Sequence, residues 1–198
     1  MLGSHLYLLY NNKYDFNPLA HYCYSLVSLK DRYTNAKQLK KVKALENSEY
    51  YLALVAIFRD EAPYLKEWIE FYRAIGIEHF YLHNHLSQYD FAEVLKPYID
   101  EGIVTLNNVS IEARDKAHWN EIQNSAYFST IQEVKDNVEW LVIVDTDEFL
   151  FPVKEKNLAN ALKEYDEYAG LAVNWRIFGS SNIKKIRNYS GIVIIQMF

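Results

Sequence analysis

From Tyr50 onward the hydrophobic residues alternate between two spacings. A continuous apolar run, such as residues 51–58, is typical of a strand covered on both faces. Between such runs, apolar residues recur every three or four positions, as expected for amphipathic helices. The pattern predicts strands over 51–58, 79–83, 103–106, 139–144 and 171–173, and helices after residues 62 and 90, over 117–134 and from 158. This alternation predicts an α/β fold, a mostly parallel sheet with helices on both faces.

Proline and glycine mark the ends of two of these helices. Pro63 falls in a first helical turn, where its missing N–H costs nothing, and Gly76 is expected to end that helix. In the next helix Asp90 is a candidate N-cap, and Pro97 is expected to kink or end the helix.

Residues 1–49 differ from the rest and are treated as a separate N-terminal segment, helical and basic, ahead of the domain at 50–198. Leu19, Tyr22, Cys23 and Leu26 form one amphipathic helical stripe, and the following residues 30–43 are rich in lysine. A basic segment of this kind can lie against anionic lipid, and a solvated helix or linker explains the same pattern.

Composition narrows the function classes. The 198 residues are 50% hydrophobic and carry a net charge of -5, which gives no reason to expect nucleic acid as a partner. A single cysteine, Cys23, excludes an intramolecular disulfide and a cysteine-rich zinc module. The apolar run at 6–10 is too short to span a bilayer. A cytoplasmic protein is expected, peripheral at the inner face of a membrane at most.

At the ends of two predicted strands the sequence changes from apolar to charged within one residue. Arg59, Asp60 and Glu61 follow the first strand, and Asp145-Thr146-Asp147 follows the fourth. Parallel strands end at the same edge of a sheet, so these acids are expected to lie near one cleft. Alternatively, acids at a helix start interact with the helix dipole, and Asp145 could cap its own loop.

Carboxylates two residues apart can bind one hard cation together. Mg²⁺ and Mn²⁺ prefer oxygen ligands and usually complete their coordination with water and substrate phosphates. Asp145 and Asp147 are therefore the candidate metal ligands, and Asp145 could bind a ribose hydroxyl instead.

Other catalytic motifs are missing from the chain. It contains no P-loop, no G-x-G-x-x-G, no G-x-S-x-G elbow and no H-E-x-x-H pattern. His83, His85 and His118 are accordingly expected to be ordinary hydrogen-bonded or surface histidines.

Several segments together resemble glycosyltransferase family 92 and the related family 2-like enzymes of the GT-A fold. The resemblance covers about residues 50–196. Its blocks are ALVAIFRDEAPYLKEWIEFY from Ala53, GIEHFYL from Gly76, Gln123, residues 140–150 and NWRIFGSS from Asn174.

The resemblance implies a metal-dependent glycosyltransferase, with Mn²⁺ or Mg²⁺, that moves a sugar from a UDP-sugar donor to a glycan or other hydroxyl acceptor with inversion. It implies that Asp145 faces the ribose or the metal and that Asp147 ligates the metal. It places near the donor the following residues: Phe58, Arg59, Asp60, Glu61, Asn84, Arg114, Gln123 and Trp175.

The chain departs from the family pattern in two ways. His83 stands where the family often has an aspartate, and relatives continue well past Phe198 into the part that usually carries the acceptor site and general base. The catalytic base is therefore not assigned. A non-catalytic or truncated nucleotide-binding module of the same fold is the alternative reading, and a nucleotidyltransferase is a third that lacks its usual glycine-rich phosphate loop.

Overall fold

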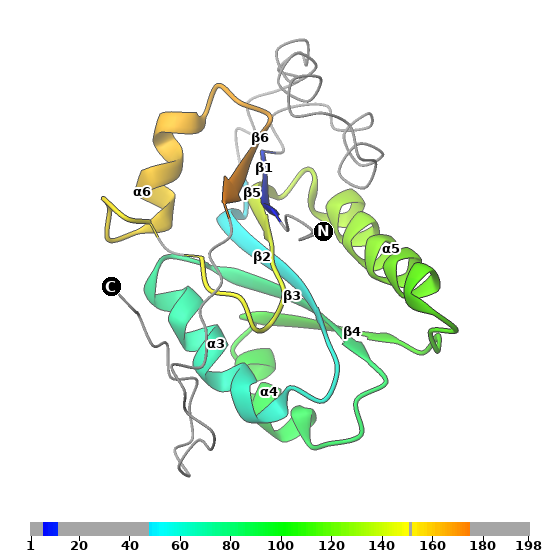
Figure 1. The fold of residues 1–198 in the computed structure, drawn as a ribbon. Coiled ribbons are helices and arrows are strands. Elements are labelled where there is room, and N and C mark those ends of the chain that lie inside the picture. The colour runs from blue at the N-terminus through cyan, green and yellow to red at the C-terminus, as the bar shows by residue number, and fades with distance from the viewer. Residues whose placement is uncertain (1–5, 12–47, 151, 175–198) are drawn as a thin grey trace, which may run out of the picture.

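A six-stranded sheet in the order β4-β3-β2-β5-β1-β6 forms the centre of the molecule (Figure 1). The computed structural model describes residues 6–11, 48–150 and 152–174. Four strands run parallel: β2 (Tyr50–Phe58), β3 (His79–His85), β4 (Val104–Val109) and β5 (Val138–Ile143). Strand β1 (Leu6–Asn11) lies antiparallel between β5 and β6 (Gly170–Asn174).

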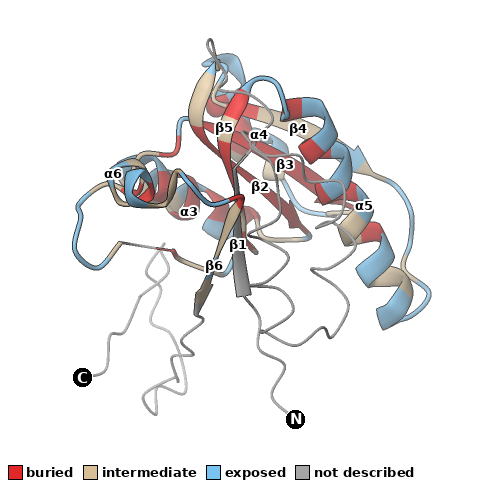
Figure 2. Cartoon of the chain, turned by 90° about the horizontal axis from the view of Figure 1, so that it is seen from above, coloured by how far each residue is buried: buried red, intermediate tan, exposed pale blue. Residues whose placement is uncertain are grey.

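Helices cover both faces of the sheet (Figure 2). One face carries α3 (Ala62–Ala74), α4 (Phe91–Asp100) and the short α6 (Leu158–Leu162), which continues into the 3₁₀ turn Lys163–Tyr165. The opposite face carries α5 (Lys116–Val134). None of these helices is long and apolar enough to cross a membrane. The predicted α/β class, with a mostly parallel sheet between two helical layers, is confirmed.

The apolar sequence of strand β2 is explained by the helices that cover both of its faces. Leu52, Leu54 and Ala56 pack on the α3 and α4 face, whereas Ala53 and Val55 pack under α5. Successive side chains of a strand point to opposite faces, so a strand with helices on both sides needs an unbroken hydrophobic run.

The N-terminal segment contributes a strand that the sequence pattern did not predict. Residues 6–11 lie within the segment assigned as separate and helical, yet they pair with both β5 and β6. The helix expected around 19–26 and the basic residues 30–43 lie outside the described residues.

Helix α4 differs in part from its sequence expectations. It does not end at Pro97 but continues to Asp100, and Asp90 stands at the N-cap position without a capping hydrogen bond from its side chain. Tyr98, directly after the proline, is buried in the core, and its packing favours continuation of the helix. Gly76, in contrast, follows the end of α3 with a φ of 106°, as glycine permits, and a Cβ there would lie 2.6 Å from Asn157 Nδ2.

The strand order reverses between β2 and β5. The chain passes from β2 to β3 and β4 in one direction, and α5 then carries it back to β5 on the other side of β2. In open α/β sheets, ligands bind beyond the carboxyl ends of the strands that flank such a reversal. The acid-rich turns after β2 and β5 are thus at the position where the fold favours a ligand.

Candidate functional site

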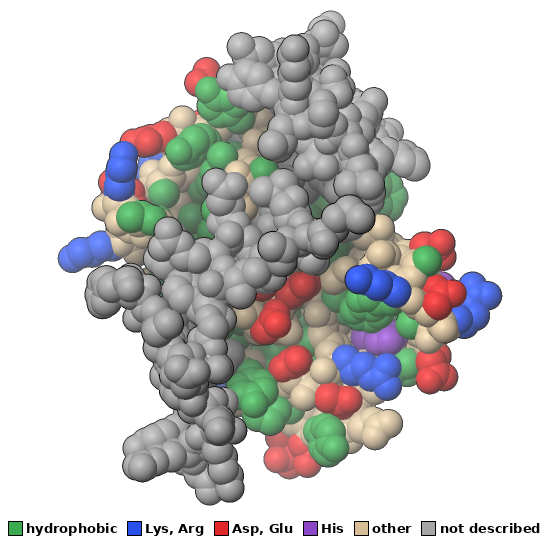
Figure 3. Space-filling model, in the orientation of Figure 1, with side chains coloured by type: hydrophobic (Ala, Val, Ile, Leu, Met, Phe, Trp, Pro, Cys, Tyr) green, Lys and Arg blue, Asp and Glu red, His purple; other side chains and the backbone are tan. Residues whose placement is uncertain are grey.

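Acidic residues from the two strand ends come together at the reversal point. We call Asp60, Glu61, Asp145 and Asp147 the acidic edge. Burial raises the pKa of Glu61, and the negative charges of Asp147 and then Asp60 raise it further. Glu61 and Asp147 therefore interact across the two loops. Figure 3 shows acidic side chains grouped near the middle of one face of the molecule.

Asp145 is held in place by residues of helix α5 and of its own loop. Its Oδ1 accepts hydrogen bonds from Gln123 Nε2 and from the Tyr127 hydroxyl, each 3.2 Å long. Gln123 Nε2 also lies 3.2 Å from the Tyr127 oxygen, so the three groups form a closed ring. The Asp145 N–H donates to Glu148 Oε2 at 3.0 Å, and the Glu148 N–H donates back to the Asp145 carbonyl. Glu148 thus shapes the turn.

The resemblance pointed to Gln123, whereas Tyr127 falls within the helix predicted over 117–134 and was not among the residues proposed for the site. Its apolar spacing identifies a buried side, but spacing cannot show that the phenolic hydroxyl reaches Asp145.

Replacing Tyr127 with phenylalanine is expected to weaken Mn²⁺-dependent UDP binding by about tenfold. Mutation of residues that orient a metal-site carboxylate typically lowers metal affinity 10–100-fold. The lower end is expected because Gln123 still bonds to Asp145 Oδ1. Isothermal titration of Tyr127→Phe measures the change. In an Asp145→Asn background the same substitution should have little further effect, since coupled residues are not additive. Equal losses in both backgrounds would show that Tyr127 does not act through Asp145.

The turn after β5 is also anchored from the opposite side, by helix α3. Trp68 Nε1 and the Tyr72 hydroxyl both donate to the Glu148 carbonyl, at 3.0 and 3.1 Å. The Tyr72 oxygen in turn accepts a 2.9 Å hydrogen bond from the Leu150 N–H. Both aromatic side chains are fully buried. Trp68 and Tyr72 are four residues apart in the helix predicted after residue 62, a spacing that puts them on one side of it. Only the structure shows that their polar atoms position the acidic turn.

The turn after β2 is locked to the turn after β3. Asp60 adopts a positive φ of 59°, an uncommon conformation for a residue with a side chain. Its N–H donates to Ser87 Oγ, and its Oδ1 accepts from the Gln88 N–H at 2.7 Å. Asn84 Oδ1 accepts from the Ser87 N–H, while its Nδ2 donates to Asn108 Oδ1. Asn84 and Asp60 are therefore joined through one hydrogen-bonded corner, and Asp60 connects this corner to the acidic edge.

The other residues proposed for the donor site lie in different surroundings. The Phe58 side chain is 2% exposed and packs against Phe91 in the core, so only its backbone is available to a ligand. Arg59 is exposed, with Nε 3.9 Å from Asp60 Oδ2. Arg114 donates from its backbone N–H and its Nε to His118 Nδ1, each at 3.2 Å. Trp175 lies outside the described residues.

The three singled-out histidines all make hydrogen bonds. His83 and His85 are buried on β3, where Nε2 of His83 pairs with Thr130 Oγ1 and Nε2 of His85 donates to the Ile111 carbonyl. His118 is the partner of Arg114.

The carboxylates fit a divalent cation that takes most of its ligands from elsewhere. Within residues 6–11, 48–150 and 152–174 no group of three or more His, Cys, Asp or Glu side chains is arranged to hold a metal. Asp147 is exposed and Asp145 half-buried, and the pKa of Glu61 is raised by burial first and then by the negative charges of Asp147 and Asp60. The carboxylates of Asp145 and Asp147 suit Mg²⁺ or Mn²⁺ when water and phosphate oxygens complete the coordination shell of the cation.

Two surface hollows lie away from the acidic edge. A hollow of about 530 Å³ is lined by residues of α3 and α4, and a groove of about 360 Å³ lies between β4 and α5. The four acids line neither of them. Position at the strand reversal, rather than hollow size, therefore identifies the candidate donor site.

An open, mostly parallel α/β sheet with a strand reversal is a doubly wound fold, a class of protein that binds its ligand at the reversal point. The family model for glycosyltransferase family 92 matches residues 54–192, and the chain belongs to this family.

Relatives among curated proteins agree with the family. A family 92 protein of Ricinus communis is 25% identical over 139 residues, covering 68% of this chain and 24% of that protein. Galactan beta-1,4-galactosyltransferase GALS3 of Arabidopsis thaliana is 28% identical over 145 residues, covering 70% and 27%. The chain thus matches about a quarter of the length of each of these relatives.

Among solved structures, S. aureus TarS 1–349 is similar with a TM-score of 0.41 and 12% identity, covering 59% of this chain and 31% of that one. At this level of likeness the fold description rests on the strand order and layers of the chain itself.

Proposed function

We propose that this chain binds the nucleotide-sugar donor of a glycosyltransferase and acts in metal-dependent, inverting transfer of the sugar to a glycan or other hydroxyl acceptor. The observation that carries the proposal is the meeting of Glu61 and Asp147 at the strand reversal. UDP is the expected nucleotide. Since GALS3 is named a galactosyltransferase, UDP-galactose is the first donor to test.

In this mechanism Asp147 would hold the cation, and Asp145 would share it or bind the ribose. A divalent cation supplies charge neutralisation for the departing diphosphate, worth several kcal/mol because that charge grows in the transition state. Gln123 and Tyr127 keep the Asp145 carboxylate in one orientation, so this interaction requires no reorganisation during the reaction. The corner made by Asp60, Ser87 and Asn84 presents polar groups to the nucleoside side.

A thermal-shift panel tests this function directly. UDP, UDP-galactose, UDP-glucose and GDP-mannose are each added with Mn²⁺ or with EDTA. A ligand that binds only the folded state raises its stability, by about 2.7 kcal/mol at a hundred times its dissociation constant. We expect stabilisation by UDP and a UDP-sugar with Mn²⁺ only. Stabilisation by none of them, or equally in EDTA, contradicts the proposal.

A coupled assay that measures the release of UDP from UDP-galactose distinguishes an enzyme from a non-catalytic binding module. Metal-dependent UDP binding without any release would identify the chain as a nucleotide-binding module. The peripheral membrane contact proposed for the basic residues 30–43 involves a part of the chain outside the described residues.

A further inference from the structure

A groove lies between strand β4 and helix α5, and the α5 residues that line it are not the ones that bond to Asp145. It has a volume of about 360 Å³, within the range of small-molecule sites. Gln123 and Tyr127 of α5 bond to Asp145, whereas Ile122, Ala126 and Ser129 of the same helix line the groove. The groove is therefore separate from the acidic edge.

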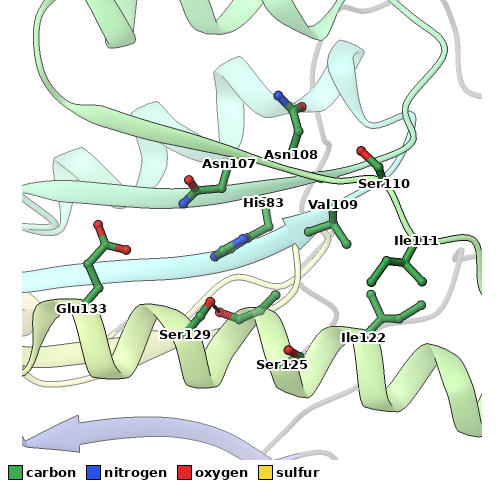
Figure 4. Close-up of a pocket in the computed structure, with 11 residues that line it drawn as sticks. His83, Asn107, Asn108, Val109, Ser110, Ile111, Ile122, Ser125, Ser129 and Glu133 are labelled. Carbon is green, nitrogen blue, oxygen red and sulfur yellow. Dashed lines mark hydrogen bonds between the residues drawn. The ribbon is translucent and has the colours of Figure 1, made fainter.

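A buried histidine forms the floor of the groove. The imidazole of His83 is 4% exposed and extends from β3 toward α5, with Asn107 on the neighbouring strand (Figure 4). Thr130 donates its hydroxyl hydrogen to the Ala126 carbonyl, so its oxygen accepts from His83 Nε2–H at 2.7 Å. In this tautomer Nδ1 is a hydrogen-bond acceptor. Burial lowers the pKa of His83, which keeps the ring neutral.

The polar groups around this floor include both donors and acceptors. Glu133, the charged residue of the lining, offers acceptors, and its side chain rises from α5 toward the strand (Figure 4). Asn107 and Ser125 offer both kinds of group. A phosphate would be repelled by Glu133, and a protonated amine has no lone pair with which to accept a hydrogen bond from the Asn107 amide or the Ser125 hydroxyl. Hydroxyl groups both donate and accept, so a neutral polyol matches the set.

The other end of the groove is apolar. Val109, Ile111 and Ile122 line it, and Ile111 is 57% exposed. Contact with the C–H face of a sugar ring would remove this surface from water. We infer that the groove between β4 and α5 binds a neutral saccharide unit, as a glycan-binding site separate from the donor site.

Saturation-transfer NMR tests this inference with β-1,4-galactotetraose, cellotetraose and maltotetraose, and with spermidine and inorganic phosphate for comparison. We expect saturation transfer to at least one tetrasaccharide at millimolar concentration. Ser125→Trp fills the groove from an exposed position on α5 and should lower the affinity at least about tenfold, equal to about 1.4 kcal/mol. Gln132→Trp puts the same side chain on an exposed position of α5 outside the groove and should leave the affinity within about twofold.

The inference fails if no tetrasaccharide binds, if spermidine or phosphate binds instead, or if Ser125→Trp binds as tightly as wild type. If Ser125→Trp does not fold, Asn107→Ala removes an amide from the opposite wall and should also weaken saccharide binding. Mn²⁺-dependent UDP binding should persist in both variants, so loss of the saccharide site and loss of the proposed donor site give different results.

Discussion

Replacing Asp147 with alanine is expected to abolish Mn²⁺-dependent UDP binding. Asp147 is exposed at the carboxyl end of β5, and its charge reaches Glu61 on the neighbouring loop. We expect the affinity to fall by more than about 100-fold, because even residues behind the metal ligands typically change metal affinity 10–100-fold. Isothermal titration with UDP and Mn²⁺ measures the loss. Asp136→Ala, at an exposed acid following α5, should bind like wild type.

The same variant provides a second readout that needs no ligand. The negative charge of Asp147 raises the pKa of Glu61, so its removal should move that pKa down toward the ordinary glutamate value. Carbon-detected NMR titration of the Glu61 carboxyl in wild type and Asp147→Ala measures this change. An unchanged Glu61 pKa would show that the two loops do not meet. A lowered Glu61 pKa together with undiminished UDP binding would show that the two loops meet but that Asp147 is not a metal ligand.

Replacing Tyr72 with phenylalanine is expected to destabilise the fold and the acidic turn together. The hydroxyl donates to the Glu148 carbonyl and accepts from the Leu150 N–H. Its removal leaves the buried Leu150 N–H without this acceptor, at a cost of about 1–3 kcal/mol, while Trp68 still bonds to Glu148. Urea unfolding should show this loss in the free energy of unfolding.

Tyr64→Phe is the matched control for this experiment. Tyr64 lies on the same helix, and its side chain is 42% exposed, so loss of its hydroxyl should change the free energy of unfolding by less than about 0.5 kcal/mol. Tyr72→Phe should also weaken Mn²⁺-dependent UDP binding at temperatures where the variant is folded, because the turn that carries Asp145 and Asp147 loses an anchor. Full stability in Tyr72→Phe would contradict the proposed role of this hydroxyl.

The elements and their order follow from local physics. Apolar runs such as residues 51–58 predicted the parallel strands, and apolar residues recurring every three or four positions predicted the helices. The buried side of α3 has this spacing, at Leu65, Trp68, Ile69 and Tyr72. Both signals arise from the fixed geometry of a strand or helix and are therefore readable without the rest of the molecule. Pro97 shows the limit of such rules. Helix α4 does not end there but continues to Asp100, with Tyr98 packed in the core.

The amino-acid sequence by itself determined the α/β class, the alternation of elements and the position of the two acidic turns at strand ends. Tertiary structure alone decided that β2 and β5 are neighbours, that residues 6–11 add a strand beside them, and that Tyr72 and Tyr127 bond to the turn after β5. The physical reason is that strand neighbours and side-chain hydrogen bonds join residues far apart along the chain, and no short-range spacing encodes which partners will meet.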